Sequence, residues 1–154
     1  MAEKSRYYLI ACGTSNYKDQ DVDNLDSVPT DLQRVVDLLT HKFGYEEALT
    51  DFRLNPNKDD LIKEFSNWLQ HEERCESDRV IFYYSGHGEY CHGDRHYLLM
   101  EDTVLNQLPQ TSLPTEELVR PLNNEGVKLE QILYIIDTCF SGVGISDVSK
   151  FTTQ

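Results

Sequence analysis

Two apolar runs of the same build constrain the fold of this chain more than any other feature. Residues 80–88 (VIFYYSGHG) end on His87 between two glycines, and residues 135–142 (IIDTCFSG) pass from isoleucines to an acid and then to Cys139. A strand that is apolar on both faces is typical of a parallel sheet covered on both sides. Each run therefore predicts a buried strand that delivers one reactive side chain at its C-terminal end.

The other predicted elements alternate between strand and helix, which favours an α/β fold with a largely parallel sheet. In such sheets, sites form just outside the carboxyl ends of the strands, where His87 and Cys139 both fall. In the first half of the chain we predict a strand over Arg6–Gly13, a loop to Pro29, and a helix over Asp31–Lys42 that is capped by Thr30 with Gln33. A short strand around Ala48–Phe52 and a helix capped by Asn57 follow. After the His87 strand we predict a strand over His96–Met100 and a short helix that is capped by Thr115 and ends before Pro121.

Length and charge narrow the functional classes. The 154 residues predict a single domain, and the net charge of -13 argues against nucleic acid as a partner and favours basic ligands. No run is long and apolar enough to predict a membrane span, and no secretory leader is recognisable, so we expect a cytoplasmic protein without a membrane partner. We interpret the four cysteines as free thiols because no C-x-x-C pair occurs.

Cys139 and His87 are the types of residue that nucleophilic catalysis needs. A thiol attacks a carbonyl as thiolate, and a neighbouring imidazole can accept the thiol proton and later return it to the leaving amine. The N–H groups of Gly88 and Cys139 could hold the developing oxyanion. A cysteine at the end of an apolar strand is more often a buried hydrophobe, but the paired contexts of Cys139 and His87 favour catalysis.

The same two motifs carry a family resemblance. Ser85-Gly86-His87-Gly88, followed about fifty residues later by D-T-C-F-S-G at residues 137–142, resembles the caspase-like cysteine peptidases, and the D-x-C-x-S-G form is closer to the metacaspases. The strings HYLLMEDT and LPTEELVR resemble bacterial caspase-like effector domains. The resemblance covers roughly residues 6–145 and implies a three-layer sandwich, with His87 as general base and acid and Cys139 as nucleophile.

The resemblance also implies a preference for arginine or lysine at P1, the substrate residue before the cleaved bond. Metacaspases hold this side chain with residues that correspond here to Asp137, Ser85 and Asp31, although Val28 replaces the cysteine of the pattern that contains Asp31. A carboxylate beside a catalytic cysteine raises the pKa of the thiol unless a cation neutralises it, which favours the same role for Asp137. The alternatives are that Asp137 hydrogen-bonds loop amides and that Asp31 only stabilises the start of a helix.

Neither a metal nor a cofactor is predicted. Residues 19–24 (DQDVDN) begin like a calcium loop, but Asn24 and Thr30 replace its glycine and its last acid, so calcium activation, known in some metacaspases, is not supported by a complete site. Cys91, His92 and His96 lack a fourth zinc ligand at suitable spacing.

We expect residues 1–154 to form the large-subunit portion of one caspase-like domain, made as a precursor. A C-terminal small-subunit segment or a sensor domain would then be a partner, and Lys150 and Asp147 are candidate processing sites. Three alternatives stay open: a non-catalytic scaffold, cleavage after Asp, and a cysteine hydrolase of other amides or esters.

Overall fold

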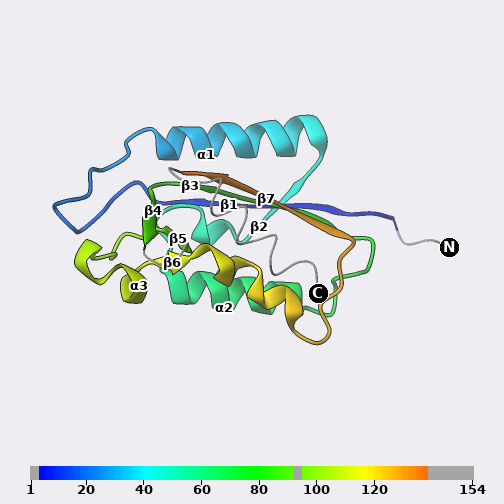
Figure 1. Ribbon diagram of the computed structural model, residues 1–154. Helices are drawn as coiled ribbons and strands as arrows, with labels where there is room; N and C mark the ends of the chain where they lie inside the picture. Colours follow the sequence, from blue (N-terminus) through cyan, green and yellow to red (C-terminus); the bar gives the residue numbers. More distant parts are fainter. Residues whose placement is uncertain (1–3, 92–94, 139–154) are drawn as a thin grey trace.

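A parallel four-stranded sheet forms the centre of the molecule (Figure 1). The computed structural model describes residues 4–91 and 95–138. The strand order is β2-β1-β3-β7, and all three neighbouring pairs are parallel. The α/β prediction is thereby confirmed. The strands are β1 (Tyr7–Gly13), β2 (Glu46–Ala48), β3 (Arg79–Ser85) and β7 (Gln131–Asp137).

Helices cover the two faces of this sheet. Helix α1 (Val28–Asp37), which continues into a π-helical turn over Leu38–Lys42, lies on one face, and α2 (Lys58–Leu69) lies on the other (Figure 1). Alternate side chains of each strand point to opposite faces, so β1 and β3 supply both cores. The α1 side holds Leu9, Ala11, Ile81 and Tyr83, and the α2 side holds Tyr8, Ile10, Cys12, Val80, Phe82 and Tyr84.

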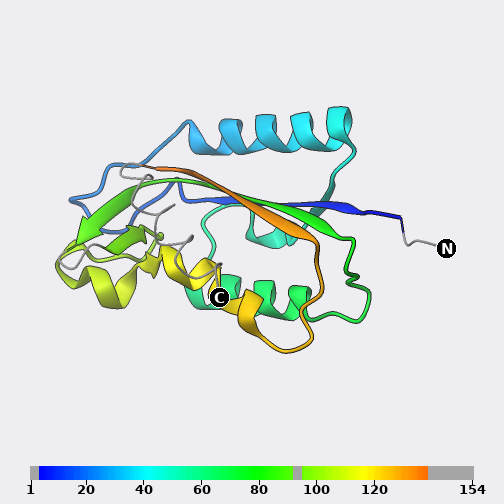
Figure 2. The same cartoon turned by 45° about the vertical axis from the view of Figure 1, so that its right-hand side comes forward.

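A second, antiparallel sheet follows β3. It consists of β4 (Gly88–Cys91), β5 (Arg95–Leu98) and β6 (Leu113–Pro114), in the order β4-β5-β6. Figure 2 shows this small sheet at the end of the central sheet where β3 ends. Between β5 and β6 the chain forms a 3-10 turn at Leu105–Gln107 and α3 (Leu108–Thr111), and between β6 and β7 it forms 3-10 turns at Thr115–Leu118 and Arg120–Asn123. A strand over His96–Met100 and a short helix capped by Thr115 were expected here, and the strand is observed as β5, ending at Leu98.

The predicted caps had different outcomes. Asn57 caps α2 as expected, because its side-chain oxygen accepts hydrogen bonds from the N–H groups of Asp59 and Asp60. The Thr30 capping box is wrong, since α1 starts at Val28, with Pro29 in its first turn and Ser27 as an N-cap that makes no side-chain cap bond.

Two further expectations are corrected. The strand around Ala48–Phe52 is wrong after Ala48, because Leu49 adopts a left-handed backbone (φ 54°) and Thr50–Phe52 form a 3-10 turn. Thr115 begins a 3-10 turn whose N-cap is Pro114, while its own hydroxyl is bonded to His96 instead of capping. In the described part of the chain, no helix has the length and apolarity needed to cross a membrane.

Candidate active site

The carboxyl ends of three strands meet at one edge of the central sheet. Gly13 pairs with Ser85, and Ser85 pairs with Asp137, so the last residues of β1, β3 and β7 are neighbours. The N–H of Gly86 also donates to the carbonyl of Asp137 at 3.3 Å. Gly13 is required at this edge, because a Cβ there would lie 2.5 Å from the carbonyl oxygen of Ser85. The register thus sets Ser85 beside Asp137, as expected for a site at the strand ends.

His87 lies in the turn between β3 and β4, and its polar groups are closely held. Its N–H donates to the hydroxyl of Tyr17 at 2.9 Å, and its carbonyl accepts the N–H of Leu99 at 3.0 Å. The ring nitrogen Nε2 lies 2.8 Å from the carbonyl oxygen of Asp23. Because a carbonyl only accepts hydrogen bonds, Nε2 carries the proton and Nδ1 keeps its lone pair in the neutral ring.

An acidic group lies at the neighbouring strand end. Asp137 is exposed, and its Oδ2 accepts a hydrogen bond of 3.3 Å from the hydroxyl of Tyr83. Burial raises the pKa of Tyr83, the negative charges of Asp137 and Asp31 raise it further, and a hydrogen bond with Ser85 opposes them. The hydroxyl of Tyr83 therefore lies beside Asp137, and its pKa is also affected by Ser85 and by the charge of Asp31, the other two residues expected to bind a basic side chain.

Asp31 has a second neighbour. It lies in the first turn of α1, where an acid is stabilised by the helix dipole, and its Oδ1 is 3.7 Å from Nη1 of Arg34. Both side chains are well exposed, so this ion pair is weak and an arriving cation can compete with Arg34.

The remaining predicted site residues are only partly covered by the structure. Gly88 is buried, begins β4 directly after His87 and pairs with Leu98. Cys139 and the candidate processing sites Lys150 and Asp147 lie outside the described residues, which end at Thr138.

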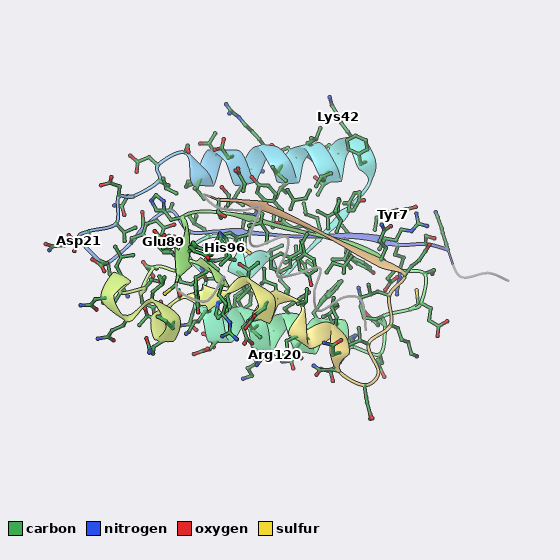
Figure 3. The ribbon with its side chains drawn as sticks, in the orientation of Figure 1. Tyr7, Asp21, Lys42, Glu89, His96 and Arg120 are labelled. Carbon is green, nitrogen blue, oxygen red and sulfur yellow. The ribbon has the colours of Figure 1, made fainter. Side chains whose placement is uncertain are left out.

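A buried histidine joins the two sheets beside this edge. His96, labelled in Figure 3, is fully buried, with Nδ1 at 2.7 Å from the hydroxyl of Thr115 and Nε2 at 3.3 Å from that of Thr138. Thr138 immediately precedes Cys139, so β5 is tied to the end of β7. Sequence reasoning treated His96 as an ordinary strand residue, although a histidine within an apolar run has to find partners when buried.

Two tyrosines and one backbone group were also missed. Tyr17 was given no role and Tyr83 was interpreted as a core residue. A buried tyrosine hydroxyl needs a hydrogen-bond partner, and that requirement is the signal that could have identified them. The carbonyl of Asp23 could not be identified from sequence, since any residue supplies a carbonyl.

In the acidic loop after β1, the carboxylate of Asp19 accepts hydrogen bonds from backbone N–H groups. Asp19 accepts hydrogen bonds from the N–H of Leu105 at 2.8 Å and of Asp21 at 3.0 Å, which lowers its pKa. Within residues 4–91 and 95–138, no group of three or more potential ligands is placed to hold a metal ion.

Nearly the whole chain is similar to a known protein family. The family model described as caspase domain matches residues 7–153, and no curated protein matches the sequence. The matched range contains both sheets, α1, α2 and the strand ends that carry His87 and Asp137. The parallel sheet between two helical layers agrees with the fold that the resemblance implied. The chain therefore belongs to the caspase domain family of cysteine peptidases.

Proposed function

We propose that this protein is a cysteine endopeptidase in which His87 and Cys139 form the catalytic dyad and which cleaves after arginine or lysine. Membership of a peptidase family makes a protein or peptide the substrate. The observation that carries the dyad is the hydrogen bond between Nε2 of His87 and the carbonyl of Asp23. It leaves Nδ1 as the basic nitrogen at the edge of the sheet where the chain continues from Asp137 to Cys139.

The proposed reaction has two stages. The thiol proton passes to Nδ1 of His87 as sulfur attacks the scissile carbonyl, while the N–H groups of Gly88 and Cys139 stabilise the oxyanion. His87 then protonates the leaving amine, which leaves an acyl-enzyme on Cys139. Water, deprotonated by His87, hydrolyses the thioester and restores both groups. Two side chains, two backbone N–H groups and a water supply this chemistry, so no metal or cofactor enters the proposal.

The acidic side chains at the strand ends support the basic specificity. Asp137 is exposed and faces the neutral hydroxyl of Tyr83, and in the described part of the chain no cation pairs with its carboxylate. Asp31 adds a second carboxylate, whose charge also raises the pKa of Tyr83. An arginine or lysine side chain would gain from both acids, with Ser85 as a further polar contact, and would relieve the effect of Asp137 on the thiol.

The outer edge of the central sheet supports the expected partner. In the strand order of the described residues β7 is terminal, and two of its apolar side chains are exposed, Leu133 by 50% and Ile135 by 39%. An edge strand with exposed apolar residues favours the addition of another strand. We therefore propose that a C-terminal small-subunit segment pairs with β7. We also propose that the protein is a cytoplasmic effector of the bacterial caspase-like type. It would be made as an inactive precursor, which this segment or a sensor domain activates.

The test is cleavage of fluorogenic peptides that differ only at P1. We expect cleavage after Arg and Lys, and a loss of at least about 10³-fold in kcat/KM on Cys139→Ala or His87→Ala, because each removes one half of the dyad. Cys75→Ala is the matched control, as it removes a thiol at the opposite end of β3.

The alternatives predict different results. Undiminished cleavage by Cys139→Ala would refute the dyad. Faster cleavage after Asp would overturn the basic specificity, and binding of peptides without turnover in any variant would favour a non-catalytic scaffold.

A further inference from the structure

Tyr17 lies against His87, although 69 residues separate the two in the sequence. Its hydroxyl accepts the N–H of His87 at 2.9 Å and donates to the carbonyl of Thr14 at 2.9 Å. The centres of the Tyr17 and His87 rings are 5.0 Å apart, tilted by 49°. One side chain therefore contacts both the backbone and the ring of His87.

The loop that carries Tyr17 also supplies the partner of the imidazole. The N–H of Tyr17 donates to the side-chain oxygen of Asn24 at 2.8 Å, and Asn24 directly follows Asp23, whose carbonyl holds Nε2 of His87. Residues 17–24 therefore hold both the backbone and the ring of His87. Tyr17 takes part in both, because it binds the backbone of His87 and the side chain of Asn24, the neighbour of Asp23.

The peptide before His87 has little room to move. A Cβ on Gly86 would lie 2.9 Å from the hydroxyl oxygen of Tyr84 and 3.2 Å from that of Tyr17. Gly86 therefore allows the chain to pass close to both hydroxyls, and the turn is held against Tyr17.

The ring of Tyr17 is fixed independently of its hydroxyl. It packs in a cluster with Tyr97, Leu99 and Leu108 beside the small sheet. Burial raises the pKa of Tyr17 to about 12, so the hydroxyl keeps its proton at neutral pH and stays both donor and acceptor. Substitution by phenylalanine removes these two hydrogen bonds and retains the packing.

We propose that Tyr17 is a positioning residue for catalysis, which holds the backbone of His87 so that its imidazole meets the carbonyl of Asp23 and the substrate in one orientation. The proposal rests on the dyad proposed above. Tyr17 acts on His87 through the backbone hydrogen bond and the ring contact. Its effect is on the geometry of the base, which belongs to the turnover step more than to substrate binding.

The test compares Tyr17→Phe with Tyr134→Phe in the form of the protein that cleaves the Arg peptide. Tyr134 is the matched control, because its largely buried hydroxyl also donates to a backbone carbonyl, that of Leu118 at 2.7 Å, without contacting His87. We expect Tyr17→Phe to lower kcat by about 10- to 100-fold with KM changed by less than about 3-fold, and Tyr134→Phe to leave both near the wild-type values.

Amide hydrogen exchange at His87 gives a readout that is independent of activity. We expect it to be at least about 10-fold faster in Tyr17→Phe than in the wild type, since the N–H loses its acceptor. Unchanged kcat in Tyr17→Phe, with or without faster exchange, would overturn the positioning role. An equal loss of kcat in both variants would also overturn it, because the effect would then be one of general stability.

The two proposals fail in distinguishable ways. A wild-type protein that cleaves the Arg peptide with a dispensable Tyr17 hydroxyl removes only the positioning role. A wild-type protein that cleaves none of the peptides removes the dyad and the positioning role with it.

Discussion

The carboxylate of Asp137 is the acidic group of the candidate site that lies nearest to Cys139 in the sequence. Asp137 ends β7, pairs with Ser85 across the sheet, and accepts a hydrogen bond from the neutral hydroxyl of Tyr83. Within residues 4–91 and 95–138 no cation pairs with this carboxylate, which leaves most of its hydrogen-bonding capacity for a charged partner. At the scale of the residue, this is the difference between an acid that only holds a loop and one that can receive a substrate cation.

Asp137→Asn preserves the shape of this side chain and removes its charge. We expect KM for Arg peptides to rise by about 10-fold or more, and the preference for Arg over an uncharged P1 side chain to fall by a similar factor. Glu76→Gln is the matched control, since it removes one exposed charge in the loop before β3, away from the strand ends. Peptide kinetics measure both variants, and unaltered selectivity in Asp137→Asn would rule out its role.

The long apolar runs were predictable as strands, and the short, half-exposed strands were not. The burial expected for the run before Cys139 is wrong for β7, where Leu133 and Ile135 are exposed and Ile136 is buried, because β7 is the terminal strand of the sheet within the described residues. Residues 80–84 could only be a covered strand, and Asn57 before two aspartates could be identified as a cap. By contrast, β4 and β6 have no apolar periodicity of their own, because tertiary pairing with β5 forms them.

The candidate site divides in the same way. His87, Ser85 and Asp137 could be located because they follow recognisable strands. The hydroxyl of Tyr17 and the carbonyl of Asp23 come from a loop whose path depends on its hydrogen bonds to Asn24 and Leu105, and no local pattern encodes that path.

An ion pair ties β1 and β3 together at their other end. Asp78 is fully buried and precedes β3, and its two oxygens accept hydrogen bonds of 2.8 and 3.0 Å from Arg6, which precedes β1. Burial alone would raise the pKa of Asp78, but the hydrogen bonds from Arg6 and Cys75 outweigh it, so the pKa is lowered. The carboxylate therefore stabilises the fold above the pKa of an unfolded aspartate, and this contribution is lost as the pH falls below about 4.

Asp78→Asn should therefore destabilise the protein by about 2–3 kcal/mol at neutral pH, because it leaves the donors of Arg6 and Cys75 poorly paired. It should also flatten the decline in stability below pH 4. Urea unfolding at several pH values measures both effects. The control is Glu130→Gln, which breaks an exposed pair with Arg79 and should have a much smaller effect, so equal losses would contradict this account.

In the whole molecule, the net charge and the exposed edge of the central sheet both agree with the proposed function. The net charge of -13 favours a basic substrate over a nucleic acid, and the exposed carboxylate of Asp137 lies at the carboxyl end of the sheet. The Arg6–Asp78 ion pair lies at the opposite ends of its strands. One end of the sheet is therefore stabilised by paired charges, and the other end exposes the carboxylate of Asp137. β7 joins these features, since it carries Asp137, leads to Cys139 and leaves Leu133 and Ile135 exposed.

Covalent labelling tests whether Cys139 is a nucleophile next to a site for a basic side chain. Peptidyl electrophiles with Arg, Asp or norleucine at P1 are added to the wild type, Cys139→Ala and His87→Ala, and adducts are located by mass spectrometry. We predict one adduct per chain, on Cys139, formed fastest by the Arg peptide, slowed in His87→Ala and absent in Cys139→Ala. Labelling of Cys12, Cys75 or Cys91 at the same rate, or an Asp peptide that reacts faster than the Arg peptide, would contradict the account.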